Sequence, residues 1–353
     1  MSRILFTAGP VEVRQDVLNA MTAPMITHRG VEYKKLHRNI VNRMKELLHT
    51  ENDILMLPAS STGAMEAAVR STVSERIMHL TCGAFGERWV EISKSNGKIV
   101  TQISTEWGNG ISAELLEEAE GIEETECVAI THNETSTGVM NPLEEIASAV
   151  RKKGDPLLLV DAVTSAFANT IDLRKVKADV FIFGTQKALA LPPGLAFAVV
   201  SPRTIEKAKM VKNRGRYLDL LEIKEFADRD LVPTTPPISL MYALDYQLQK
   251  IEQEGMERRS QRHRTLGEMA RKWASENMAL FTRDGFYSNT VTCVKNTAGI
   301  EYSTIDRELG RRGYQISEGY GRLKPETFRI GHMGDLTTDE MKGLLEALSE
   351  VLK

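Results

Sequence analysis

Residues 157–194 read LLLVDAVTSAFANTIDLRKVKADVFIFGTQKALALPPG, and two short apolar runs within this stretch decide the fold. The first run, 157–160, ends in Asp161, and the second run, 180–183, is followed by Gly-Thr-Gln and then Lys187. Short apolar runs bounded by small or turn-forming residues are typical of buried parallel strands. In an open α/β sheet, ligands bind beyond the carboxyl ends of such strands. We therefore expect Asp161 and Lys187 to lie at a ligand site.

The bulk composition is that of an ordinary soluble globular protein, with 42% hydrophobic and 26% charged residues in 353 positions. This length suffices for two domains. The net charge of −3 gives no general attraction to nucleic acid or to an anionic membrane. No run approaches the roughly 20 apolar residues of a membrane span. Cys82, Cys127 and Cys293 are widely spaced, so we expect neither a metal site nor a disulfide framework. Reduced cysteines and the lack of an export signal favour the cytoplasm.

Strand and helix signals alternate along the first 200 residues. The pattern predicts strands at 54–57, 77–80, 126–131, 157–160, 180–183 and 195–200. Helical patterns cover 31–49, the segment after Gly63, 84–95 and 143–152. Strands that alternate with helices indicate a mostly parallel sheet covered on both faces.

The character of the chain changes after about residue 231, where three prolines interrupt regular structure. A long helical pattern begins at about 238, and the basic stretch 258–264 near its far end is interpreted as a solvent-exposed face. The remainder predicts strand, helix, strand and helix at 290–294, 303–312, 327–331 and 337–352. We therefore predict an N-terminal arm, a large domain that includes the linking helix, and a small C-terminal α+β domain, at 1–15, 16–260 and 261–353.

Lys187 and Asp161 have alternative interpretations when each is taken alone. A lysine near a strand end is usually exposed, but Lys187 is flanked by apolar residues, and an unpaired buried ammonium costs several kcal/mol. Desolvation would lower the pKa of the lysine and favour the nucleophilic amine. Asp161 could cap the segment that follows, or it could keep a pyridine nitrogen protonated. A carboxylate at a pyridine nitrogen and an imine-forming lysine together describe a site for pyridoxal 5′-phosphate.

The segment Ser60-Ser61-Thr62-Gly63 opens a predicted helix after a predicted strand. Hydroxyls and free amides at a helix amino terminus form an anion site. The alternative is a plain N-cap, although a cap needs one hydroxyl and three occur here in a row. No GxGxxG or GxxxxGK[ST] motif lies nearby, so the pattern favours a phosphate group over a dinucleotide or a nucleoside triphosphate.

Four further residues are candidates for contacts to a ring or a substrate. Phe85 lies between glycines, so its ring could lie against a bound aromatic ring or belong to the core. Glu134 and Thr135 could reach a ring hydroxyl, or they could belong to a capped turn. Arg329 lies between Phe and Ile in a predicted strand and could face solvent by alternation. Its guanidinium could instead bind a substrate carboxylate in bidentate fashion.

These segments follow one another in an order that resembles the class V aminotransferases of fold type I, and in particular the alanine–glyoxylate and serine–pyruvate aminotransferases. The resemblance extends from TAGPVEVRQDVLNAM at 7–21 to FRIGHMGD at 328–335. Its most specific parts are SSTGAMEAA at 60–68, GAFGERW at 83–89, THNETSTGV at 131–139, LLLVDAVTS at 157–165 and GTQKALALPPG at 184–194.

The resemblance implies a large domain with a mostly parallel seven-stranded sheet, a smaller C-terminal α+β domain, and pyridoxal 5′-phosphate as cofactor. Lys187 then forms the Schiff base, and Asp161 contacts the pyridine nitrogen. The other implied cofactor contacts are ring stacking by Phe85, phosphate binding by Ser61, Thr62, Gly63 and Gln186, and a contact from Thr135 near the ring hydroxyl. The implied substrate contacts are Arg329 at the α-carboxylate and Gly9 and Pro10 along the pocket.

The resemblance also implies a homodimer with active sites at the interface, in which Thr234 reaches the phosphate of the neighbouring subunit. Some relatives carry a tyrosine where this chain has Leu231, so the sequence departs from the family pattern beside that contact. The implied reaction is a ping-pong transfer of an amino group from serine or alanine to glyoxylate or pyruvate.

Other activities on the same scaffold stay open at this point. His28-Arg29, Trp107-Gly108 and the segment 141–145 are similar to the 2-aminoethylphosphonate aminotransferases, and aspartate or phosphoserine are further possible donors. A lyase or cysteine desulfurase shares the fold, but a desulfurase needs a reactive cysteine on a mobile loop, and Cys293 lies in an apolar run. A non-catalytic relative is expected to have lost Asp161 or Lys187, and both are present.

Overall fold

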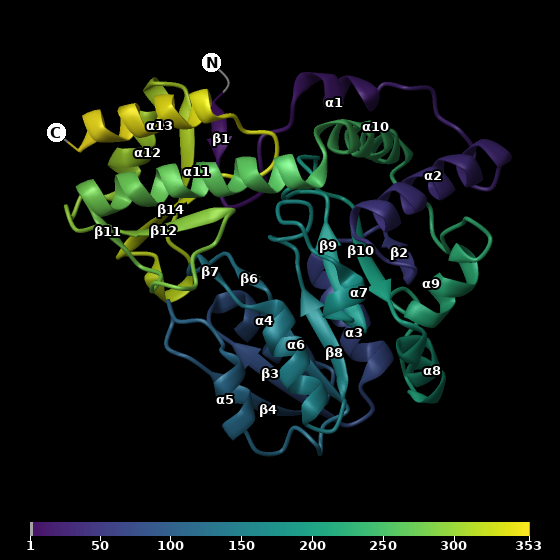
Figure 1. Cartoon of the computed structure of the whole chain (residues 1–353). Coiled ribbons are helices and arrows are strands. Elements are labelled where there is room, and N and C mark those ends of the chain that lie inside the picture. The colour runs from purple at the N-terminus through teal and green to yellow at the C-terminus, as the bar shows by residue number, and fades with distance from the viewer. Residues whose placement is uncertain (1–2, 353) are drawn as a thin grey trace.

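The computed structural model describes residues 3–352. Its larger sheet has seven strands in the order β2-β10-β9-β8-β5-β3-β4 (Figure 1). Their bounds are Asp53–Leu57, Ala196–Val200, Val180–Gly184, Leu157–Asp161, Cys127–Thr131, Arg76–Thr81 and Ile99–Ser104. The strands from β9 to β4 pair in parallel, and β10 is antiparallel to both of its neighbours. The mostly parallel sheet predicted from the sequence is thus confirmed.

Every residue of β5, β8, β9 and β10 is buried, because helices cover both faces of this sheet. Alternate residues of β8 belong to the cores on opposite faces of the sheet: Leu158 and Val160 join one hydrophobic cluster, whereas Leu157 and Leu159 join the other. The first cluster includes residues of α2 (Val31–Leu47), α6 (Leu143–Lys152), α7 (Leu173–Val176) and α10 (Ile238–Glu254). The second includes residues of α3 (Ser61–Thr72), α4 (Ala84–Ser95) and α9 (Leu220–Ala227). Further helices are α1 (Gln15–Ala20), α5 (Ala113–Glu118) and α8 (Pro202–Met210).

A second sheet of five strands lies beside the first, in the order β1-β13-β14-β12-β11. The bounds are Ile4–Phe6, Tyr314–Glu318, Thr327–Gly331, Val291–Lys295 and Ala279–Leu280. Its core includes side chains of α11 (Met256–Asn277), α12 (Tyr302–Arg311) and α13 (Thr338–Val351). The first strand pairs with β13, so the amino-terminal segment belongs to the C-terminal sheet (Figure 1). A short two-stranded ribbon, β6 (Asn133–Glu134) with β7 (Val139–Met140), follows β5.

The linking helix predicted from about 238 does begin at Ile238, but it does not continue through the basic stretch. It ends at Gly255, where φ is +79°, and α11 starts at Met256. The predicted boundary at 260/261 therefore falls within α11, and our domain division stays a proposal. The interpretation of the basic stretch as a solvated face is wrong for three residues, because Arg259, Ser260 and His263 are buried. Arg259 is 1% exposed and pairs with Glu254 and Asp335, and His263 is fully buried.

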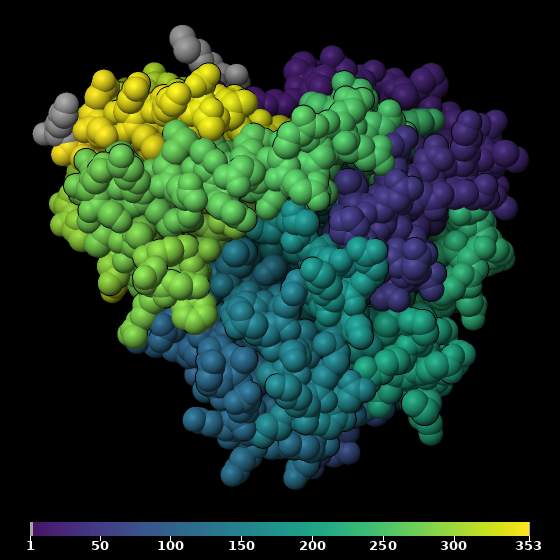
Figure 2. Space-filling view, in the orientation of Figure 1, coloured from purple at the N-terminus to yellow at the C-terminus, as the bar shows by residue number. Residues whose placement is uncertain are grey.

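In the space-filling view, light-green atoms of the C-terminal half lie directly over the teal middle of the chain, with a recess where the two meet (Figure 2). No helix in residues 3–352 is long and apolar enough to cross a membrane.

Candidate active site

Asp161 ends β8 and is paired with Thr131 at the end of the neighbouring strand β5. Its two carboxylate oxygens have different partners: Oδ2 accepts a hydrogen bond from the Thr131 hydroxyl at 3.3 Å, and Oδ1 accepts one from the Val163 amide at 2.9 Å. The residue is 4% exposed. Burial raises the pKa of Asp161 to about 7, while the Val163 amide acts in the opposite direction. The bond from the Val163 amide closes a turn and caps no helix, because the next helix, α7, begins only at Leu173. A buried, easily protonated carboxyl group remains for a ligand.

Lys187 follows β9 and is 9% exposed. Its ammonium donates a hydrogen bond to the carbonyl of Ala8 in the amino-terminal segment. Burial and, to a smaller extent, the positive charge of Arg329 lower the pKa of Lys187 to about 8, whereas Asp161 acts in the opposite direction. A lysine amine that loses its proton this readily is a competent nucleophile and base near neutral pH.

The turn before α3 supplies the predicted anion site. Ser60 occupies the N-cap position of α3 but makes no side-chain capping hydrogen bond, so the simple capping interpretation is wrong. Gln186 Nε2 lies 3.5 Å from the Ser61 hydroxyl. Gly184 permits this approach, because a Cβ there would lie 2.3 Å from Ser61 Oγ and 2.8 Å from Gln186 Oε1. The start of α3 and the turn after β9 thus bring the Ser61 hydroxyl and the Gln186 side-chain amide close together.

Phe85 lies in the first turn of α4 and is held there by Glu134. The buried Glu134 carboxylate accepts hydrogen bonds from the amides of Phe85 and Gly86, each at 3.0 Å. Because the Glu134 carboxylate binds these backbone amides, it does not bind a ring hydroxyl. The Phe85 ring stacks on Tyr320, with centroids 5.0 Å apart, and its centroid is 6.0 Å from Lys187 Nζ.

Arg329 is turned inward, and the alternative in which it faces solvent is wrong. The residue is 7% exposed in β14. Its Nε donates to the Glu318 carbonyl at 3.0 Å, and its Nη1 donates to the Thr135 carbonyl at 3.2 Å. Both partners are neutral, so the guanidinium charge is available to a bound carboxylate.

Most of the predicted residues meet at one hollow of about 450 Å³, open space at its mouth included. The residues predicted from the sequence that line it are Ser61, Thr62, Phe85, Thr135, Asp161, Gln186 and Lys187. Gly9, Pro10 and Arg329 line an adjacent depression. Two predicted residues lie elsewhere: Gly63 lies within α3, and Thr234 lines neither hollow.

The structure adds residues that the sequence did not single out. Arg88 lines the hollow, its guanidinium lies 4.8 Å from the Phe85 ring centroid, and it donates a hydrogen bond to the Tyr320 hydroxyl. Arg88 lies one turn after Phe85 on α4, so helical spacing could have indicated that both side chains lie on the same face of the helix. Tyr320 comes from the segment between β13 and β14, and nothing in the local sequence signals that contact.

The comparison with family models decides the classification. Residues 5–331 match the model described as aminotransferase class-V. The chain belongs to this family. This class V aminotransferase is 34% identical to an uncharacterized aminotransferase of Methanocaldococcus jannaschii, in an alignment that covers 100% of this chain and 93% of the relative. It is 31% identical to a serine–glyoxylate aminotransferase of Arabidopsis thaliana, in an alignment that covers 99% of this chain and 90% of the relative.

Among solved structures, the aminotransferase is similar to an alanine–glyoxylate aminotransferase from Nostoc sp.. The TM-score is 0.93 at 30% sequence identity, and the match covers 100% of this chain and 96% of that one. The fold is therefore the fold type I architecture that the resemblance implied, and the enzyme is a transaminase.

Proposed function

We propose that this transaminase uses pyridoxal 5′-phosphate to move an amino group from a small amino acid, serine or alanine, to glyoxylate or pyruvate in a ping-pong reaction. The observation that carries the proposal is the convergence of Lys187, Asp161 and Phe85 on one hollow. The printed names of the relatives from Arabidopsis and Nostoc support the donor and acceptor classes.

The residues present fit this cofactor. A buried carboxyl group, an amine without a carboxylate partner and an uncapped helix start correspond to its pyridine nitrogen, its aldehyde and its phosphate. Phe85 offers one ring face at the hollow. When bound, the cofactor withdraws electron density from the substrate α-carbon. Asp161 would keep the pyridine nitrogen protonated, and Lys187 would hold the cofactor covalently.

The remaining chemistry falls to groups of the chain itself. Once the amino donor has displaced its amine, Lys187, with its lowered pKa, takes the proton from the substrate α-carbon and later gives a proton back as a general acid. Arg329 binds the α-carboxylate and so orients the bond to that proton. The Gly9-Pro10 segment closes the substrate side, because Ala8 contacts the Lys187 amine directly.

We also propose that the enzyme is a homodimer in which Thr234 completes the phosphate site of the neighbouring subunit. Thr234 lies in the loop that leads to α10 and lines neither hollow of its own subunit. The carbonyls of Val232 and Pro233 accept hydrogen bonds from Arg29, which fixes this loop at the surface.

A second candidate donor is aspartate, and Arg88 favours it. Arg88 lies at the hollow and bonds to a neutral phenol, so a second anionic group on the substrate would find an available guanidinium there. A desulfurase is disfavoured, because Cys82, Cys127 and Cys293 are all buried and burial raises the pKa of each thiol.

The test is a matrix of purified holoenzyme with serine, alanine, aspartate, phosphoserine or 2-aminoethylphosphonate as donor, and glyoxylate, pyruvate or 2-oxoglutarate as acceptor. We expect the highest kcat/KM for serine or alanine with glyoxylate or pyruvate, and parallel double-reciprocal plots. A higher kcat/KM for aspartate would select the second candidate, and no transfer from any donor would overturn the proposal.

A further inference from the structure

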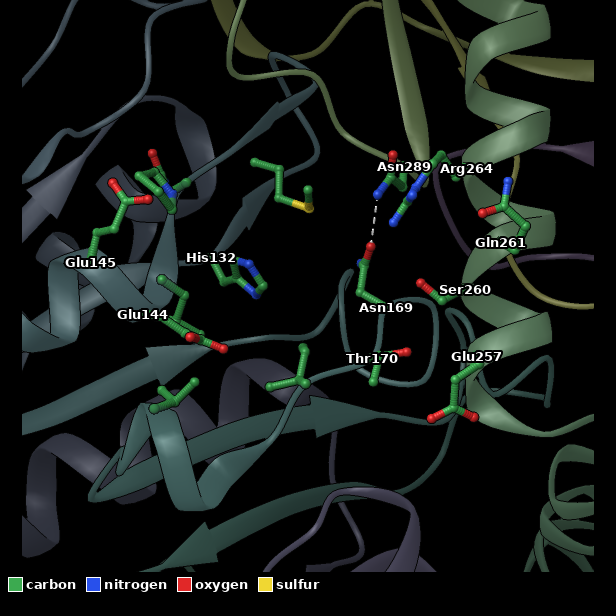
Figure 3. Close-up of a pocket in the computed structure, with 16 residues that line it drawn as sticks. His132, Glu144, Glu145, Asn169, Thr170, Glu257, Ser260, Gln261, Arg264 and Asn289 are labelled. Carbon is green, nitrogen blue, oxygen red and sulfur yellow. Dashed lines mark hydrogen bonds between the residues drawn. The ribbon is translucent and has the colours of Figure 1, made fainter.

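A second and larger hollow lies away from Lys187, between α6, the loop after β8, and α11 (Figure 3). It encloses about 1,190 Å³, open space at its mouth included. Polar side chains from both halves of the molecule reach it: His132 and Glu144 from the large sheet side, Ser260 and Arg264 from α11, and Asn289 from the segment before β12. Neither the cofactor nor the substrate proposed above uses this space.

His132 marks the hollow as more than a surface depression. The residue is 7% exposed, and its Nδ1 is buried without a hydrogen-bond partner in residues 3–352. Burial also lowers the pKa of the imidazole to about 4, so the ring is neutral and offers one donor and one acceptor. Figure 3 shows the ring and the hydroxyl of Ser260, itself 7% exposed, directed toward the space between α6 and α11. Because Nδ1 itself is shielded from solvent, a ligand in the hollow would meet the rest of the imidazole ring and the Ser260 hydroxyl.

The charges around the hollow are unbalanced. Glu144, Glu145 and Glu257 contribute three negative charges and Arg264 contributes one positive charge, which gives −2 with His132 neutral. Within the described chain these four side chains form no ion pair, whereas the adjacent Arg259 and Arg262 both pair with Glu254. Figure 3 shows Glu144 and Arg264 on opposite sides of the space.

The α11 side presents its groups in a fixed order. Glu257, Ser260, Gln261 and Arg264 follow the i, i+3, i+4, i+7 spacing of one helix face. An acid and a base thus stand at the two ends, about 10 Å apart along the axis, with a hydroxyl and an amide between them. This order matches a ligand that carries a carboxylate at one end and an ammonium at the other.

We propose that this hollow is a second ligand site that binds a free amino acid, with its carboxylate at Arg264 and the ammonium of its side chain at Glu257. The surplus of negative charge favours an amino acid with a cationic side chain, and an extended chain with a terminal ammonium matches the separation of Glu257 and Arg264 on α11. The inference does not depend on the reaction proposed for the active site.

A ligand there would contact parts of the molecule that also hold the active site. His132 directly follows Thr131, whose hydroxyl bonds to Asp161. Asn289 donates a hydrogen bond to Asn169 at 3.0 Å across the hollow's edge, and this bond joins the segment before β12 to the loop after β8. Occupancy would therefore brace the two sheets against each other and raise the melting temperature.

The test is calorimetric titration of the holoenzyme with L-lysine, L-alanine and L-aspartate. Arg329→Gln removes the carboxylate contact at the active site. Arg264→Gln and Glu257→Gln alter the second site. Lys272→Gln and Glu268→Gln, elsewhere on α11, are the charge-matched controls for the loss of a positive and of a negative charge. We expect L-lysine to bind the wild type and Arg329→Gln alike, and L-aspartate to bind more weakly than L-lysine. Loss of the guanidinium in Arg264→Gln should weaken lysine binding about tenfold or more, and Glu257→Gln should also weaken it. The controls should bind as the wild type does.

Two results would overturn the proposal. One is the absence of a second binding event at millimolar L-lysine. The other is binding that disappears in Arg329→Gln but persists in Arg264→Gln, which would place the ligand at the active site. The donor and acceptor matrix above is a separate measurement, so its failure leaves this titration interpretable.

Discussion

Gly9 and Lys187 are packed so closely that position 9 has no room for a side chain. A Cβ on Gly9 would lie 2.7 Å from Cδ, Cε and Nζ of the lysine, and φ at Gly9 is +107°. The preceding residue, Ala8, accepts a hydrogen bond from the same Nζ. The amino-terminal segment, which enters from the five-stranded sheet, thus sets the position of the lysine at the end of a strand in the other sheet.

Gly9→Ala is therefore expected to displace the Lys187 amine and to lower kcat about tenfold or more, because misplacement of a reacting group is costly. The control is Gly97→Ala, where φ is +71° and a Cβ would meet nothing within 4 Å. That variant should lose a little stability through backbone strain and keep its kcat. Equal kcat values for Gly9→Ala and the wild type would show that the contact has no role in turnover.

Asp161 makes the stability of the apoenzyme depend on pH. Because its pKa rises from 3.8 to about 7, the folded state keeps a proton that the unfolded state releases between pH 4 and pH 7. Its contribution to stability is present below pH 4 and is lost as the pH rises through this range. Asp161→Asn cannot titrate and so does not lose stability in this way. Between pH 4.5 and pH 7.5 the free energy of unfolding of the apo variant should therefore rise, relative to that of the wild type, by on the order of 2–4 kcal/mol.

Urea unfolding of both apoproteins at the two pH values measures this difference. The exposed Asp284→Asn serves as the control and should follow the wild type. If Asp161→Asn and the wild type show the same dependence on pH, the carboxyl group is not held in its protonated form.

Arg329→Gln should raise the KM for the amino donor by roughly 10- to 100-fold, because a charge-assisted contact to the carboxylate is lost. The effect on kcat should be smaller. Arg329→Lys restores the charge without the planar fork and should recover only part of the affinity. The exposed Arg307→Gln is the surface control. An unchanged KM in Arg329→Gln would remove this residue from substrate binding.

Glu134→Gln tests whether Glu134 positions Phe85. The carboxylate accepts from the amides of Phe85, Gly86 and Ser136 and from the Ser136 hydroxyl. An amide nitrogen in place of one oxygen would face these donors, so the apoenzyme should lose about 1–3 kcal/mol of stability and the holoenzyme should release its cofactor faster. Glu91→Gln on the exposed face of α4 is the matched control. Wild-type stability and cofactor release in Glu134→Gln would contradict the positioning role.

The large sheet was predictable because its strands are marked by local apolar runs. β5, β8 and β9 fall where the runs predicted them, and their parallel register places Asp161 beside Thr131. β4, at Ile99–Ser104, was missed because it is a half-exposed edge strand with no apolar run. β1 pairs with β13 across more than 300 residues, and no local pattern encodes such a pairing.

The site shows the same division between local and distant information. Alternation along β14 left Arg329 undecided, because the carbonyl of Thr135 that holds it inside comes from the turn between β6 and β7, which is distant in sequence. The sequence also left open whether Glu134 reaches a ring hydroxyl or belongs to a capped turn, since its partners on α4 are distant in sequence. The helix end at Gly255 was a readable signal, because glycine with positive φ commonly ends a helix.

The most direct measurement of the central claim is chemical trapping at Lys187. Purified holoenzyme is treated with borohydride and digested, and its peptides are analysed by mass spectrometry, with Lys187→Ala as the control. We expect one modified peptide that carries the reduced pyridoxyl group on Lys187, no such peptide in the variant, and turnover in the variant reduced at least 100-fold. Recovery of Lys187 unmodified from a coloured, active enzyme, or a pyridoxyl group on another lysine, would contradict the central claim.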